Sequence, residues 1–112
     1  MLGTGFAYDP QVRARQGAVL AAVLPRVANV RRFGSAALDL CLVGDGRLGA
    51  YYEYGIKSWD VAAGLLIAEE AGAVVSGLRG RPAGEPFVAA AGPAAAEELL
   101  ALLESLDADR MG

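Results

Sequence analysis

The stretch from Gly49 to Gly72 constrains this chain most, because it joins a strand pattern to a helix pattern through one short loop. Residues 50–52 form an apolar, aromatic run typical of a strand, and the run ends in the carboxylate of Glu53. A helical pattern begins at Trp59 and Asp60, so the two carboxylates lie at the two ends of the same loop. From the spacing alone, the favoured interpretation is that Asp60 caps the helix and complements the positive end of its dipole. The alternative is that the two carboxylates belong to one site.

The length and composition predict one globular domain. A chain of 112 residues can bury a core, and its 54% hydrophobic and 21% charged residues are typical of a folded rather than a disordered protein. No apolar run reaches the ~20 residues of a membrane span, and no basic and apolar leader opens the chain. We therefore expect a cytoplasmic protein without a membrane partner. The net charge of −3, with arginines scattered among acidic residues, does not predict a nucleic-acid partner.

The chain has no histidine and one cysteine, which narrows its chemistry. Within these residues, zinc sites of the usual type and histidine-dependent triads are excluded. Cys41 lies on the apolar side of a predicted helix and has no histidine to activate it. We interpret Cys41 as a small core residue.

Periodicity and turn residues predict an α/β fold, layered in the manner of α+β proteins, with a mixed β-sheet flanked by helices. Asp9 and Pro10 should start the first helix, Pro25 should kink or end it, and Gly72 should end the third. Residues 45–47 should form a turn, and residues 107–112 should be frayed. The predicted strands are 1–8, 29–33, 50–53, 73–76 and 86–91, and the predicted helices are 9–28, 34–43, 59–71 and 92–106.

The second predicted helix begins at Gly34 and Ser35, where backbone N–H groups can meet an anion or a hydroxyl. The alternative is that Ser35 is an ordinary N-cap. Asp39 is either an exposed helix residue or a partner behind the site, and the sequence leaves both open. Glu69 and Glu70 should face solvent near the end of the third helix, unless an arginine meets them.

Four motifs occur in one order along the chain. They are LGTGFAY at residues 2–8, GSAALDL at 34–40, GRL at 46–48 followed by YYE at 51–53, and WDVAAG at 59–64 followed by EAG at 70–72. Together they resemble the C-terminal half of the inositol monophosphatase family, metal-dependent phosphatases of small sugar and cyclitol phosphates. The resemblance covers nearly all 112 residues and thins after Val75.

The resemblance implies a role for five residues. Asp60 is expected to be a Mg²⁺ ligand near the ester oxygen and hence catalytic, Glu53 to hydrogen-bond a substrate hydroxyl, and the backbone of Gly34, Ser35 and Ala36 to line the sugar side. Carboxylates suit both tasks, because Mg²⁺ prefers oxygen ligands and a carboxylate accepts hydrogen bonds. The resemblance further implies hydrolysis of inositol 1-phosphate or a similar sugar phosphate by metal-activated water, and a homodimer for the full-length protein.

Two motifs of the family are missing, and both lie upstream in its members. They are a glutamate motif, G-x-E-E or G-S-E, and an aspartate loop, D-P-x-D-G-T. Asp9-Pro10 lacks the Asp-Gly-Thr that should follow, and one aspartate does not hold two Mg²⁺ ions. We therefore expect residues 1–112 to be the C-terminal half of an inositol monophosphatase-like domain, without its N-terminal metal-site half and inactive alone.

Two further hypotheses stay open. The first is a related phosphatase of the same superfamily, acting on fructose bisphosphate, histidinol phosphate or a 3′-phosphoadenosine nucleotide, with Glu53 and the loop 54–58 deciding between these substrates. The second is a non-catalytic half-domain that acts as a binding or oligomerisation module. Under each hypothesis a half-domain exposes apolar surface, so self-association is expected.

Overall fold

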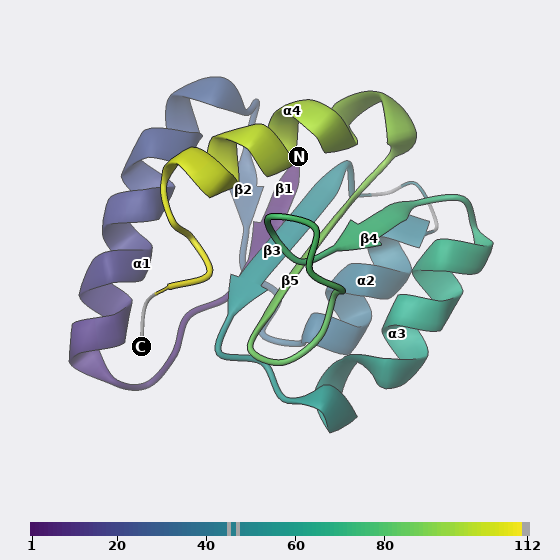
Figure 1. Ribbon diagram of the computed structural model, residues 1–112, viewed down its shortest axis with the longest axis horizontal. Coiled ribbons are helices and arrows are strands. Elements are labelled where there is room, and N and C mark those ends of the chain that lie inside the picture. Colours follow the sequence, from purple (N-terminus) through teal and green to yellow (C-terminus); the bar gives the residue numbers. More distant parts are fainter. Residues whose placement is uncertain (45, 47, 111–112) are drawn as a thin grey trace.

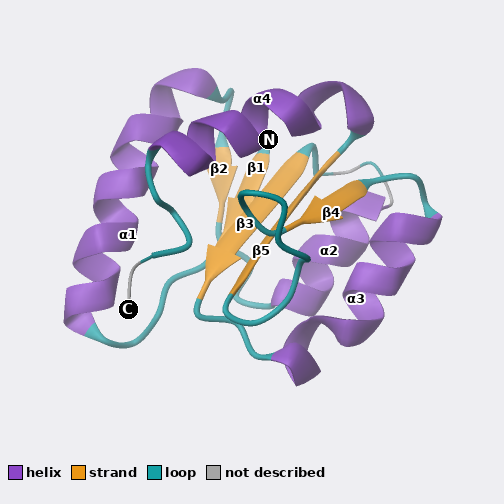
Figure 2. Cartoon of the chain, in the orientation of Figure 1, coloured by secondary structure: helices purple, strands orange, loops and turns teal. Residues whose placement is uncertain are grey.

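The computed structural model describes residues 1–44, 46 and 48–110, without the side chains of Ser58 and Asp60. Its helices and strands follow the predicted order (Figures 1 and 2). They are β1 Leu2–Thr4, α1 Pro10–Val23, the 3₁₀ helix η1 Leu24–Arg26, β2 Val30–Arg31, α2 Ala36–Gly44, β3 Ala50–Tyr54, α3 Ser58–Glu70, β4 Val74–Ser76, β5 Phe87–Ala91 and α4 Pro93–Ser105.

The five strands form one mixed sheet in the order β2-β1-β3-β5-β4. β1 runs parallel to β2 and β3, whereas β5 runs antiparallel to β3 and β4. Gly3 of β1 pairs with Tyr51 of β3, and Glu53 pairs with Val88 of β5. β3 therefore has a strand on each side and carries Glu53 to the edge where the parallel strands end.

Helices cover both faces of the sheet. Successive side chains of a strand point to opposite faces, so β3 sends Tyr52 toward α1 and α4 and Tyr51 toward α2 and α3. All five residues of β5 are buried, which explains its unbroken apolar sequence. In the described part of the chain, no helix has the length and apolar character needed to cross a bilayer.

The helix ends confirm several predictions. The Asp9 side chain accepts a hydrogen bond from the backbone N–H of Gln11 at 2.9 Å, as an N-cap should. α1 ends at Val23, just before Pro25, and Gly72 follows α3 with a φ of 95°. Within the predicted turn 45–47, only Gly46 is described.

Two strands are shorter than predicted. β1 has three residues instead of eight, and β2 has two residues instead of five. β2 is an edge strand that pairs with β1 at two positions only, so it gives the chain few hydrogen bonds. β1 pairs with β3 as far as Thr4, and residues 5–8 lie outside the sheet. Cys41 is only partly buried, because Leu40 and Val43 occupy the buried side of α2.

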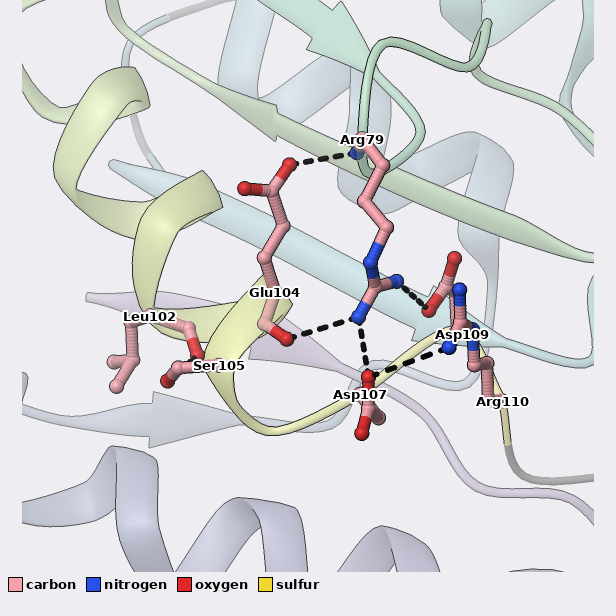
Figure 3. A network of polar contacts seen from close by, with 7 residues as sticks. All are labelled: Arg79, Leu102, Glu104, Ser105, Asp107, Asp109 and Arg110. Atoms are coloured by element: carbon pink, nitrogen blue, oxygen red, sulfur yellow. Dashed lines mark hydrogen bonds and ion pairs between the residues drawn. The ribbon is translucent and has the colours of Figure 1, made fainter.

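The prediction that the C-terminal tail is frayed is wrong for residues 107–110. The Arg79 guanidinium forms ion pairs with Asp107 and, at 2.9 Å, with Asp109 (Figure 3). Ala108 between them is fully buried. No local pattern indicates this contact, since Arg79 lies about 30 positions away in the loop between β4 and β5.

Candidate functional site

A cleft of about 630 Å³ opens where β1 and β3 end and where α2 and α3 begin. We call it the β1–β3 cleft. Its lining includes Glu53 and the segment 34–36, so four of the five predicted site residues lie around one space. The carboxyl edge of parallel strands is the usual place for a ligand site in an α/β sheet.

Glu53 reaches the cleft from the end of β3 and is half-buried. The Tyr51 hydroxyl donates a hydrogen bond to Glu53 Oε1 at 2.7 Å. On the neighbouring strand, a Cβ added to Gly5 would lie 2.5 Å from the same oxygen, which is closer than atoms can approach. Only glycine at position 5 therefore leaves room for this carboxylate.

The start of α2 forms a second part of the cleft. Ser35 Oγ accepts a hydrogen bond from the Leu38 backbone N–H at 3.2 Å, so Ser35 is the N-cap of α2. Gly34 precedes it with a φ of 81°, a conformation that favours glycine. Backbone N–H groups in the first turn of a helix lack partners inside the helix, so this end of α2 can offer donors to a ligand.

Asp39, which the sequence left undecided, is buried at 1% exposure. Burial, followed by the negative charge of Glu53, raises the pKa of Asp39 to about 7. Neither carboxyl oxygen has a hydrogen-bond partner among the residues whose side chains are placed. A Cβ on Gly3 would lie 3.4 Å from Oδ1, so Asp39 and Glu53 each face a glycine of the β1 segment. Alternating glycines opposite two acidic residues are the signal that could have indicated this pair.

Asp60 lies in the first turn of α3, and its side chain is outside the described part of the structure. Its predicted metal and catalytic roles stay predictions. The neighbouring Trp59 lines the β1–β3 cleft and is 76% exposed. α3 has no side-chain hydrogen bond from its N-cap residue, Lys57.

The described residues contain no group of three or more histidine, cysteine, aspartate or glutamate side chains placed to share a metal ion. A Mg²⁺ site needs several oxygen ligands at close to octahedral geometry. The placed side chains, which do not include that of Asp60, do not make such a site by themselves.

Sequence reasoning missed the lining that comes from residues 5–8 and from Arg32. Tyr8 is 95% exposed at the cleft, and the Arg13 guanidinium stacks 5.8 Å from the ring centre of Phe6. The sequence predicts a strand over residues 1–8, because the alternation of apolar and small residues there is typical of a strand.

Comparison with known proteins assigns this arrangement to a family. Residues 1–108 match the sequence profile of the inositol monophosphatase family. The chain belongs to this family. The inositol-1-monophosphatase SuhB of Mycobacterium tuberculosis (strain ATCC 25618 / H37Rv) is 57% identical over 106 residues, which make up 93% of this chain and 36% of the relative. The Nus factor SuhB of Xylella fastidiosa is 50% identical over 86 residues, covering 74% of this chain and 30% of the relative.

Solved structures of the inositol monophosphatase family confirm the predicted fold. Mycobacterium tuberculosis SuhB matches 94% of this chain and 41% of its own with a TM-score of 0.83 and 54% identity. The inositol monophosphatase of Anabaena (Nostoc) matches 93% of this chain and 42% of its own with a TM-score of 0.81 and 36% identity. The chain thus spans well under half the length of the relatives that it matches.

Proposed function

We propose that this chain forms the substrate side of a phosphoric monoester hydrolase acting on inositol 1-phosphate or a similar small sugar phosphate. One observation carries the proposal: Glu53 and the segment 34–36, far apart in the sequence, line the same cleft in a member of the inositol monophosphatase family. A carboxylate can accept a hydrogen bond from a ring hydroxyl, and a helix start can donate to an oxygen of the ligand.

We also propose that hydrolysis depends on Mg²⁺, with Asp60 as one ligand and the others supplied by protein outside residues 1–112. One finding supports this: the relatives are much longer than the segment they share with this chain. Bound Mg²⁺ would supply activation of water and stabilisation of charge on the phosphate. A cytoplasmic homodimer is the form in which we expect the longer protein to act.

The sequence identities of the relatives favour a phosphatase function over a role as a Nus factor. The relatives at 55–57% identity are named inositol-1-monophosphatases, whereas those named Nus factors are 42–50% identical. Related sugar or nucleotide phosphates stay as alternative substrates, and a non-catalytic binding module stays as an alternative function.

The test is phosphate release by complementation. The 112-residue chain is mixed with the separately produced part of Mycobacterium tuberculosis SuhB that it does not match, and phosphate released from inositol 1-phosphate is measured with and without Mg²⁺. We expect no release by the chain alone, release by the mixture, and a loss of at least about 100-fold with Asp60→Asn. Release that is equal in the Asp60→Asn variant would contradict the role of Asp60.

A panel of fructose 1,6-bisphosphate, histidinol phosphate and 3′-phosphoadenosine 5′-phosphate decides between substrates. The proposal predicts the highest kcat/KM for inositol 1-phosphate. A folded mixture that releases no phosphate from any of the four compounds would favour the non-catalytic module.

A further inference from the structure

We propose that Tyr51 is a positioning residue, which holds the Glu53 carboxylate in the orientation that accepts a hydrogen bond from a substrate hydroxyl. Tyr51 does not line the β1–β3 cleft, so it acts through Glu53. This inference rests on the proposed function, because it explains how the same site distinguishes a hydroxyl-bearing substrate from a bare phosphate.

The hydrogen bond between the two residues carries the inference. Tyr51 and Glu53 are two positions apart on β3, so their side chains lie on the same face of the sheet. The phenol O–H donates to Oε1 at 2.7 Å, and Tyr51 is fully buried. A buried donor to a carboxylate forms a charge-assisted bond that water does not easily replace.

The Tyr51 ring is buried in the core. The residues paired with Tyr51 are Gly3 on β1 and Ala90 on β5. Leu40 and Leu48 belong to the same core cluster, and Tyr51 is fully buried. A buried ring loses little further freedom when its hydroxyl binds Glu53, so the hydroxyl acts as a preorganised donor.

The backbone at Gly5 limits the Glu53 carboxylate from the other side. A Cβ at this position would lie within 2.5–2.7 Å of the carboxylate carbon and both oxygens. The carboxylate is therefore seated between the β1 segment and the Tyr51 hydroxyl. A carboxylate has about four lone-pair sites, so accepting from Tyr51 leaves capacity for a ligand.

The presence of Asp39 makes the Tyr51 hydroxyl more important for keeping Glu53 ionised. Asp39 is a buried acid on the same side of the sheet, and its charge and that of Glu53 disfavour each other. The proton that Tyr51 directs at Glu53 stabilises the ionised carboxylate against this neighbour. Tyr51 thus supports both the orientation of Glu53 and the ionised form that accepts a hydrogen bond.

The test compares Tyr51→Phe with Tyr52→Phe, which removes the same group from the next residue on the opposite face, where Tyr52 stacks on Phe87. Binding of myo-inositol 1-phosphate and of inorganic phosphate to the 112-residue chain is measured by calorimetry. We expect Tyr51→Phe to weaken binding of the inositol phosphate roughly tenfold, which corresponds to loss of one hydrogen bond to a charged group. Tyr52→Phe should change it by less than about twofold, and neither variant should change phosphate binding.

A double-mutant cycle with Glu53→Gln shows whether Tyr51 acts through Glu53. The inference predicts that Tyr51→Phe has almost no further effect once Glu53 is replaced. Additive effects, or equal effects of Tyr51→Phe and Tyr52→Phe, would overturn it. A wild-type chain that binds neither probe would contradict the proposed function instead. In that case the ¹³Cδ resonance of Glu53 decides: it must move in Tyr51→Phe and stay in Tyr52→Phe, and an unmoved resonance rejects the role of Tyr51.

Discussion

At the scale of single residues, the acidic side chains of Glu53 and Asp39 have opposite surroundings. Glu53 has a hydroxyl donor in Tyr51, whereas Asp39 is buried with no hydrogen-bond partner among the placed side chains. Burial without a donor favours the neutral acid, and the charge of Glu53 adds to this effect. Asp39 therefore costs stability whenever it ionises.

This cost predicts a dependence of stability on pH. The pKa of Asp39 rises from its ordinary 3.8 to about 7 in the folded chain, so the folded state keeps a proton that the unfolded state releases between these values. The free energy of unfolding should fall as the pH rises from about 4 to about 7, by about 4 kcal/mol, and then level off. Urea unfolding across this range measures it. Asp39→Asn should flatten the curve, and an unchanged slope would contradict the assignment to Asp39.

A second residue prediction concerns Gly5. A methyl group at this position collides with the Glu53 carboxylate, so Gly5→Ala must displace that side chain. We expect the variant to bind inositol 1-phosphate more weakly at little cost in stability, because the displaced carboxylate is the flexible end of a half-buried side chain. Gly17→Ala is the control, because a Cβ at this α1 position meets no atom within 4 Å. Equal binding of inositol 1-phosphate by the two variants would show that Glu53 does not lie against Gly5.

At the scale of elements, local signals in the sequence predicted the helices better than the strands. Asp9, Ser35 and Gly72 mark helix ends through hydrogen bonds and backbone angles that a few neighbouring residues decide. The length of β1 depends instead on its pairing with β2 and β3, which lie nearly 30 and nearly 50 residues away. Strand ends set by such a partner leave no local signal.

In the same way, the sequence predicted one part of the candidate site and missed another. The motifs indicated Glu53 and the segment 34–36, and the fold brings them together. The burial of Asp39 and the contribution of residues 5–8 depend on how β1 lies against α2 and β3. The alternating glycines Gly3 and Gly5 are the one signal that could have indicated the position of Asp39. The C-terminal tail is a further example, since Arg79 holds it through the loop before β5.

The tail contact yields a prediction for Arg79. The backbone N–H of Arg79 donates to Glu104 Oε2 at 2.6 Å, and its guanidinium contacts residues 107 and 109 (Figure 3). Arg79→Ala should remove the side-chain contacts and speed amide hydrogen exchange in residues 106–110, with little change in β3 and β5. Arg81→Ala in the same loop is the control. Equal exchange in both variants would show that Arg79 does not hold the tail.

At the scale of the whole molecule, α2 and α3 lie side by side (Figure 1), and both helices carry exposed apolar side chains. Leu66 is 58% exposed and Ile67 is 49% exposed on α3, and Leu38 is 46% exposed on α2. An exposed apolar surface of this kind favours association. We expect the 112-residue chain to self-associate.

Sedimentation velocity measures the association. Leu66→Lys should shift the chain toward the monomer without loss of thermal stability, because this side chain is mostly exposed. Glu69→Lys, on the exposed side of the same helix, introduces the same charged group as a control. A wild-type chain that sediments as a monomer at all concentrations would contradict the prediction.

The central claim is that the β1–β3 cleft binds the sugar side of a phosphate ester. The most direct measurement is a titration of the ¹⁵N-labelled chain with myo-inositol 1-phosphate, followed by amide chemical shifts. The account predicts saturable shifts at residues 34–36 and at Glu53, which Glu53→Gln weakens. Shifts confined to other parts of the chain, or none at these positions at saturating ligand, would contradict it.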